Sequence, residues 1–102
     1  MPADPVQFDV RNNEAARRFE VEVEGHTAFA EYRIRDDDIT FPHTVTPPEL
    51  EGRGIGGALV RAGLAFARDR GLWVIPKCEF FASYIERHPE YRSLLHPDHR
   101  GD

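Results

Sequence analysis

Four glycines lie within six residues in the stretch Gly52-Arg53-Gly54-Ile55-Gly56-Gly57, immediately before a segment with helical periodicity. The first N–H groups of an α-helix have no partner inside the helix, and the helix dipole makes that end positive. Glycines let the backbone approach a ligand without a Cβ in the way. The stretch therefore predicts a cradle for an anion, most simply a phosphate group. The alternative is a helix entry that only needs flexible turns.

Two well-known phosphate-binding motifs fit this stretch poorly. The Walker motif requires Gly-Lys-Ser or Gly-Lys-Thr at the helix start, whereas Gly56, Gly57 and Ala58 stand there. The motif G-x-G-x-x-G is matched, but it should follow the first strand of a parallel βαβ unit, and here three predicted strands precede it. A nucleotide triphosphatase and a dinucleotide-binding domain are both disfavoured.

Cys78 is the only cysteine, so an internal disulfide and a cysteine-rich zinc site are excluded. It follows a short apolar run and begins a predicted helix, where a helix N-terminus favours the thiolate. Lys77 adds a positive charge beside it. Such a thiol can act as a nucleophile or as a proton donor. The alternative is a small buried hydrophobe.

His43 is the second candidate for chemistry, because a histidine can take a proton from an amine near neutral pH. It shares a predicted strand face with Phe41 and Val45, so a hydrogen-bonded structural histidine is the equal alternative. Further along, His88 is expected to cap the last helix. Tyr84 is expected to pack, with a proton-donor role as the lesser option. Metal-ligand spacing is weak, because the histidines near the C-terminus lie in a polar tail.

Alternation and helical spacing predict three strands, a helix, a fourth strand and a second helix. A two-residue turn at Gly25-His26 is expected to join the first two strands, and Pro42 should interrupt the third. The order β-β-β-α-β-α implies an α+β fold, an α/β sandwich of a mostly antiparallel sheet with helices. A further short strand is considered near Val6–Val10. The approximate ranges are residues 19–24, 27–34, 39–45, 54–70, 72–75 and 78–88.

The length of 102 residues predicts one domain over residues 1–102, with loose ends at about 1–5 and 96–102. The net charge of −5 disfavours nucleic-acid binding, which usually shows a basic domain. No signal peptide and no apolar stretch approaching ~18 residues is visible, so no membrane partner is expected. The single cysteine fits a reducing compartment, and we expect a cytoplasmic protein.

From about Phe19 to Leu95 the chain resembles the GNAT acetyltransferase superfamily, specifically its small, minimal-length branch. The segments "HTVTPPELEGRGIGGALV" and "GLWVIPKCEFFASYIERHPEY" carry the resemblance. It implies a splayed sheet with coenzyme A lying in the V, its pantetheine arm along the strand before the glycines. Glu51 departs from the Gln or Arg that often begins this loop. The cofactor-binding residues implied are Thr44, Val45, Thr46, Gly52, Arg53, Gly54, Ile55, Gly56 and Gly57.

The resemblance implies an acetyl-CoA-dependent N-acetyltransferase in which Cys78 and His43 do the chemistry. The acceptor is expected to be an amine-bearing small molecule or a protein lysine, in a monomer or weak dimer. The tight hairpin leaves no room for the helices of larger members, so the acceptor side should be open. Glu20, Glu22 and Glu24 would favour a cationic amine. The alternatives are a non-catalytic coenzyme A binding or protein-interaction module, and a structural domain without a ligand.

Overall fold

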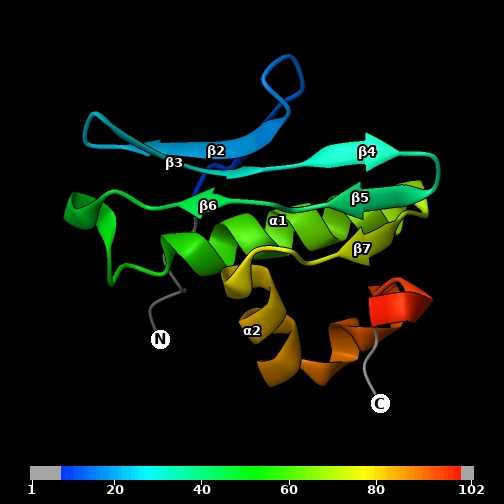
Figure 1. The fold of residues 1–102 in the computed structure, drawn as a ribbon. Coiled ribbons are helices and arrows are strands. Elements are labelled where there is room, and N and C mark those ends of the chain that lie inside the picture. The colour runs from blue at the N-terminus through cyan, green and yellow to red at the C-terminus, as the bar shows by residue number, and fades with distance from the viewer. Residues whose placement is uncertain (1–7, 100–102) are drawn as a thin grey trace, which may run out of the picture.

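The computed structural model describes residues 8–99. Two small sheets lie over two helices that are stacked one below the other (Figure 1). The first sheet has the strand order β1-β2-β3-β6 and the second β4-β5-β7. Among the strand pairs of the described residues, β5 and β7 run parallel and the others antiparallel. The predicted α+β fold is therefore confirmed. The elements are β1 (Arg11–Asn13), β2 (Arg18–Val23), β3 (His26–Glu31), β4 (Arg33–Arg35), β5 (Asp38–Thr40), β6 (Thr44–Val45), α1 (Ile55–Arg70), β7 (Trp73–Ile75) and α2 (Glu79–Arg87), with 3₁₀ turns at Pro48–Leu50, Pro89–Leu94 and Pro97–His99.

The hairpin between β2 and β3 turns one residue earlier than the sequence predicts. Val23 pairs with His26, so the turn residues are Glu24 and Gly25, not Gly25 and His26. Both have positive φ, +53° and +80°, which is the conformation of a type I′ turn. The prediction was wrong because Glu24, a residue that rarely adopts positive φ, takes the first turn position.

Two of the predicted strands are each split into two. The predicted strand 27–34 breaks at Tyr32, whose N–H donates to the carbonyl of Arg17. The predicted strand 39–45 breaks after Thr40, and β6 resumes at Thr44. Pro42 lies in this second break, where its missing N–H costs no ladder bond. The two breaks divide the sheet, so that one half of each long strand pairs in each smaller sheet.

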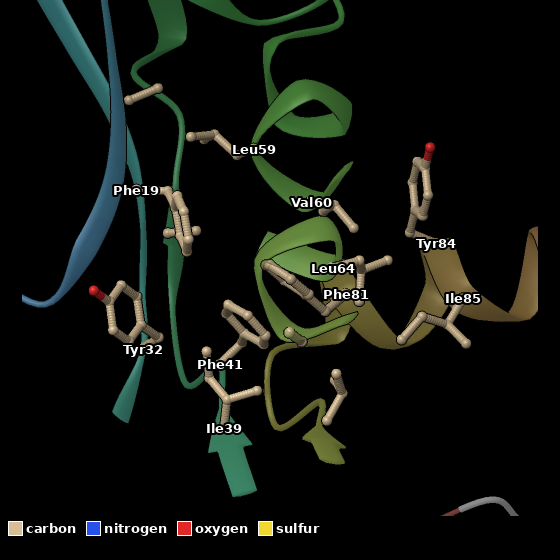
Figure 2. Close-up of a cluster of buried hydrophobic side chains, with 14 of the residues drawn as sticks. Phe19, Tyr32, Ile39, Phe41, Leu59, Val60, Leu64, Phe81, Tyr84 and Ile85 are labelled. Carbon is tan, nitrogen blue, oxygen red and sulfur yellow. The ribbon is translucent and has the colours of Figure 1, made fainter. Parts of the chain in front are cut away.

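Helix α1 is buried on two sides, against the sheet and against α2. Figure 2 shows Leu59 on the side of α1 that faces the sheet and Val60 on the side that faces α2. Both side chains are fully buried, as is Leu64 one turn after Val60. Helical spacing in the sequence predicts one apolar face, which omits Val60 and Leu64 and consists of Ile55, Leu59, Ala62, Gly63, Phe66 and Ala67. Gly71 ends the helix with φ +67°, which agrees with the predicted helix range of 54–70.

The segments after α1 agree with the prediction in type and differ in burial and extent. In β7, Val74 is fully buried but Trp73 is 37% exposed, so the run is not a wholly buried strand. Cys78 and His88 are the residues flanking α2, and His88 is its C-terminal cap. Residues 96–99 are not loose, because the N–H of His96 donates to the carbonyl of Val74 at 2.9 Å.

The extra strand expected near Val6–Val10 was also misplaced. Within the described residues it is β1, which begins at Arg11 and pairs with β2. Val6 and Gln7 lie outside the described residues, as do the predicted loose ends 1–5 and 100–102. In the part of the chain that the structure describes, no helix is long and apolar enough to cross a bilayer.

Gly63 fixes how closely α1 approaches the aromatic pair beneath the sheet. Phe41 and Phe81 stack with ring centroids 4.1 Å apart (Figure 2). A Cβ on Gly63 would lie 2.9 Å from Cε1 of Phe41 and 3.3 Å from Phe81. Both rings are fully buried, so neither can swing away.

We therefore expect Gly63→Ala to lower the free energy of unfolding by about 1–3 kcal/mol through overpacking. Helix propensity alone would raise it by roughly 1 kcal/mol. Urea denaturation measures the difference, with Ala65→Gly on the exposed side of α1 as the propensity control. A stabilised Gly63→Ala variant would contradict the close contact.

Candidate functional site

The loop before α1 leaves the first turn of the helix without a side-chain cap. Gly52 and Gly54 adopt left-handed conformations, with φ +81° and +83°, which glycine reaches without a Cβ penalty. Gly54 is the N-cap residue, and its carbonyl accepts the N–H of Ala58 at 3.2 Å. The N–H groups of Ile55, Gly56 and Gly57 therefore have no partner inside the helix.

Gly56 is a glycine for a different reason than the sequence predicts. A Cβ at this position would lie 2.3 Å from Cζ of Phe80, so the Phe80 ring lies directly against the first turn of α1. Phe80 is 41% exposed although it is apolar. The room that glycine provides at position 56 is thus taken by the protein's own aromatic ring. The ring forms an apolar wall beside the free amides.

Arg53 does not face the amides of the first turn. Its Nη1 lies 3.2 Å from Oε1 of Glu24, in the turn between β2 and β3. Both side chains are exposed, so the pair adds little stability, but it occupies the guanidinium. Glu51 is also exposed. The arginine beside the first turn is instead Arg61, whose Nη1 would lie 3.2 Å from a Cβ on Gly57.

The edge of β6 that faces away from β3 has no neighbouring strand among residues 8–99. Glu31 donates its N–H to the carbonyl of His43 at 2.9 Å, and Ala30 is opposite Thr44. Antiparallel pairs alternate between bonded and non-bonded, so the N–H and C=O of Thr44 point to the free edge. Those of Val45, opposite Phe29, point to β3. Thr46 follows β6 and precedes the two prolines.

The sheet opens at Phe41. Its N–H donates to the carbonyl of Ile75 at 3.1 Å, and its carbonyl accepts the N–H of Cys78 at 2.8 Å. Beyond this point the chain through Pro42 to β6 runs with β3, while the chain after Cys78 enters α2. Thr44 and Cys78 therefore lie on opposite sides of the opening, next to its closed end.

The thiol of Cys78 meets the hydroxyl of Thr44 across this opening. Sγ lies 3.3 Å from Oγ1, in a geometry in which the thiol donates. Cys78 is partly buried and is a free cysteine. The sequence assigned Thr44 only a backbone role. Its hydroxyl could have been proposed only by knowing that the strand break brings residue 44 next to residue 78.

His43 is exposed, and it does not share the environment of Phe41, which is fully buried. The predicted common face is wrong because the chain bends at Pro42 between them. In the extended chain His43 projects to the face opposite Thr44, so the structure does not bring it to the thiol. No hydrogen bond of the His43 side chain occurs within residues 8–99.

Tyr84 is buried and packs, as predicted, with its ring stacked 4.0 Å from that of His88. Its hydroxyl lies 3.3 Å from Nη1 of Arg61, on α1. Nδ1 of His88 lies 2.9 Å from the carbonyl of Tyr84. These contacts explain the positions of the Tyr84 hydroxyl and of the Tyr84 and His88 rings without requiring a catalytic role for either residue.

The carboxylates expected to attract a cationic amine are mostly engaged. Glu20 accepts a hydrogen bond from Nε of Arg18 at 2.7 Å and one from Asn13. The bond from Arg18 holds the pKa of Glu20 below its ordinary value. Glu24 pairs with Arg53. In the described part of the chain, only Glu22 of the three has no ion-pair partner, and no group of three or more His, Cys, Asp or Glu there could hold a metal ion.

Comparison with known proteins agrees with this geometry. The family model of the GCN5-related N-acetyltransferases matches residues 18–94. The chain is also similar to a Staphylococcus aureus protein solved by NMR and described as a "GCN5-like putative N-acetyltransferase". The two share 26% sequence identity with a TM-score of 0.68, over 94% of this chain and 98% of the other. The chain therefore belongs to the GCN5-related N-acetyltransferase family, and it is an N-acetyltransferase.

Proposed function

We propose that the chain binds acetyl-coenzyme A and moves its acetyl group to an amine. One observation carries the proposal: the opening between Thr44 and Cys78 has a free strand edge on one side and a thiol on the other. The uncapped first turn of α1 follows β6 after a short loop. A ligand with an anionic diphosphate and a chain of amide groups matches the helix amides and the strand edge.

The residues present fit this ligand. Amides of Ile55, Gly56 and Gly57 would hold the diphosphate, since Gly52 and Gly54 have no Cβ to block its approach. Thr44 is favoured over Val45 as the backbone partner of the pantetheine arm, because the amide groups of Val45 face β3. Phe80 would pack against the apolar part of the arm. Arg53, which is paired with Glu24, is not needed.

When bound, acetyl-coenzyme A supplies an acetyl group activated as a thioester. Cys78 can serve transfer in two ways. In direct transfer the amine nitrogen bonds to the carbonyl carbon, the C–S bond breaks, and Cys78 gives its proton to the departing sulfur. In covalent transfer Sγ of Cys78 takes the acetyl group, coenzyme A leaves as its thiol, and the amine then takes the acetyl group and restores the Cys78 thiol. Thr44 accepts the thiol hydrogen and can donate its own hydroxyl to a thiolate.

His43 lies in the open, on the other face of the strand, and would take the proton of the amine through water. The acceptor proposed is an amine-bearing small molecule or a protein lysine, because no described element covers that face of β3 and β6 (Figure 1). We further propose that the protein is a monomer or weak dimer without a nucleic-acid or membrane partner. Its proposed location is the cytoplasm, where a free thiol persists. A coenzyme A binding module without catalysis is the alternative.

Binding at the first turn of α1 is tested with Gly56→Val. A branched side chain there displaces Phe80 and covers the amides, so the Kd for coenzyme A should rise about tenfold or more. Isothermal titration measures it, and circular dichroism checks folding. Ala65→Val, on the exposed side of the same helix, is the matched control and should bind as the unchanged protein does. Equal affinity of all three proteins would show that the ligand does not use this turn.

The role of Cys78 is tested by mass spectrometry after incubation with acetyl-coenzyme A. A gain of one acetyl group on Cys78, chased by an added amine, supports the covalent route. Cys78→Ala should lower kcat about 100-fold or more in either route, as loss of a nucleophile or general acid does. His43→Ala should lower kcat, because the amine then loses the base that takes its proton, whereas His99→Ala, at an exposed histidine, should leave kcat unchanged. Unchanged turnover in Cys78→Ala would remove the thiol from the mechanism.

The contact between Thr44 and Cys78 is tested by alkylation with iodoacetamide. A hydroxyl that donates to the thiolate favours the reactive form, so Thr44→Val should slow alkylation about threefold or more at pH 7. Thr46→Val, two residues later on the same strand path, is the control and should leave the rate unchanged. A faster reaction in Thr44→Val would mean that the hydroxyl only shields the sulfur.

A further inference from the structure

A hollow lies at the opposite end of α1 from the free amides. Its volume is about 600 Å³. Phe66 and Arg70, from the last turns of α1, line it. At 1.5 Å per residue these turns are roughly 20 Å from Gly56. The remaining lining residues are Glu14, Arg17, Tyr32, Arg33, Ile34 and Arg35. The hollow is therefore separate from the site of the proposed acetyl transfer.

The hollow is basic in an acidic protein. Four arginines and one glutamate line it, in a chain of net charge −5. Nη2 of Arg70 lies 3.8 Å from Oε2 of Glu14. Arg17, Arg33 and Arg35 make no ion pair with any residue in 8–99. The arginines come from three separate elements: the turn at residues 14–17, strand β4 and helix α1. A charged edge strand alone would place arginines only on β4.

The floor of the hollow is apolar and well fixed. The rings of Phe19, Tyr32 and Phe66 contact one another with centroids 5.2–5.8 Å apart. Tyr32 is buried, and its hydroxyl donates to Oδ1 of Asn12 at 2.7 Å. Ile34 is 47% exposed, which makes it the most exposed large hydrophobic residue in the described chain.

The hollow also lies at a strand edge. β4 pairs with β5 on one side, and no strand pairs with its other side within residues 8–99 (Figure 1). β2 would continue alongside β4, but it begins only at Arg18 because the chain turns at residues 14–17. Such an edge presents unpaired N–H and C=O groups. The hollow is the space that an additional strand beside β4 would occupy.

We propose that an extended acidic peptide of another protein adds to β4 in this hollow. Side chains alternate along a strand, so Arg33 and Arg35 project to one face and Ile34 to the other, the face of its buried partner Ile39. Carboxylates two residues apart on the added strand lie opposite Arg33 and Arg35. The apolar residue between them packs beside Ile34, above Phe66.

Charge excludes a second copy of this chain in the same place. Two β4 strands paired across a two-fold axis would put Arg33 and Arg35 opposite each other, and like charges directly opposite destabilise a sheet. A chain of net charge −5 also lacks the extended basic surface that nucleic acids need. The acidic peptide is therefore the occupant that the described residues favour.

The probe is a fluorescein-labelled peptide of alternating glutamate and valine, followed by fluorescence polarisation. Arg35→Glu and, separately, Arg33→Glu should weaken binding about tenfold or more. Arg87→Glu makes the same charge change at an exposed arginine of α2 and should weaken it less than twofold. NMR amide shifts should centre on Tyr32–Arg35 and Arg17. Thermal unfolding checks that each variant is folded.

Two further peptides separate strand addition from simple attraction. Glutamine in place of glutamate should abolish binding, and N-methylation of alternate amides, which keeps the charges but removes strand hydrogen bonds, should weaken it about tenfold or more. The proposal would be overturned if Arg87→Glu weakened peptide binding as much as Arg35→Glu does, or if the N-methylated peptide bound as tightly as the unmodified one. A dimer that buries β4, or tighter binding of an oligonucleotide of equal charge, would also overturn it. Coenzyme A binding should be unchanged in Arg35→Glu, so this proposal and the proposed function can fail independently.

Discussion

The backbone of Phe41 sets the position at which the sheet divides. Its N–H and C=O are both bonded to the chain around β7, at Ile75 and Cys78. The next residue, Pro42, has no N–H to continue the ladder. The chain therefore leaves β7 at this residue and joins β3 two residues later. The free edge of Thr44 and the position of the Cys78 thiol both follow from this one change of partner.

Side-chain packing holds that division in place. Phe41 precedes the opening and Phe81 follows it, so their stacked rings tie its two sides together beneath the closed end. Burying each ring contributes about 2–3 kcal/mol, and Gly63 lets α1 pack directly against them. Just beyond this closed end the two sides are held more loosely: Thr44 and Cys78 share one hydrogen bond, and Phe80 is partly exposed. The structure is thus rigid where the sheet closes and accessible where a ligand would enter.

Local sequence signals predicted what local physics decides. The alternation in β2, the glycine that ends α1, and the boundary of α2 before Pro89 each depend on residues within a few positions, and each was predicted correctly. The turn at Glu24-Gly25 was missed because it needs a positive φ that glutamate seldom adopts. Burial of Val60 was missed because it depends on the distant helix α2. The partner of the Cys78 thiol depends on the division of the sheet, which only tertiary contacts determine. The contact of the Phe80 ring with Gly56 could not be predicted from local periodicity either.

Dividing one sheet into two creates additional edges, and the described chain protects them by different means. The edge of β7 is covered, since Val74 bridges to Leu95 and accepts a hydrogen bond from His96. β6 is two residues long and is followed by Pro47 and Pro48, which prevent another strand from extending along it. β4 carries arginines on both sides of Ile34, which oppose pairing with its own copy. Short length and like charge both block self-association, yet a single extended ligand can still bind. The division at Phe41 opens a neutral edge beside a thiol. The turn at residues 14–17, before β2, leaves a basic edge at the far end of α1, so each proposed site arises where a strand lacks its neighbour.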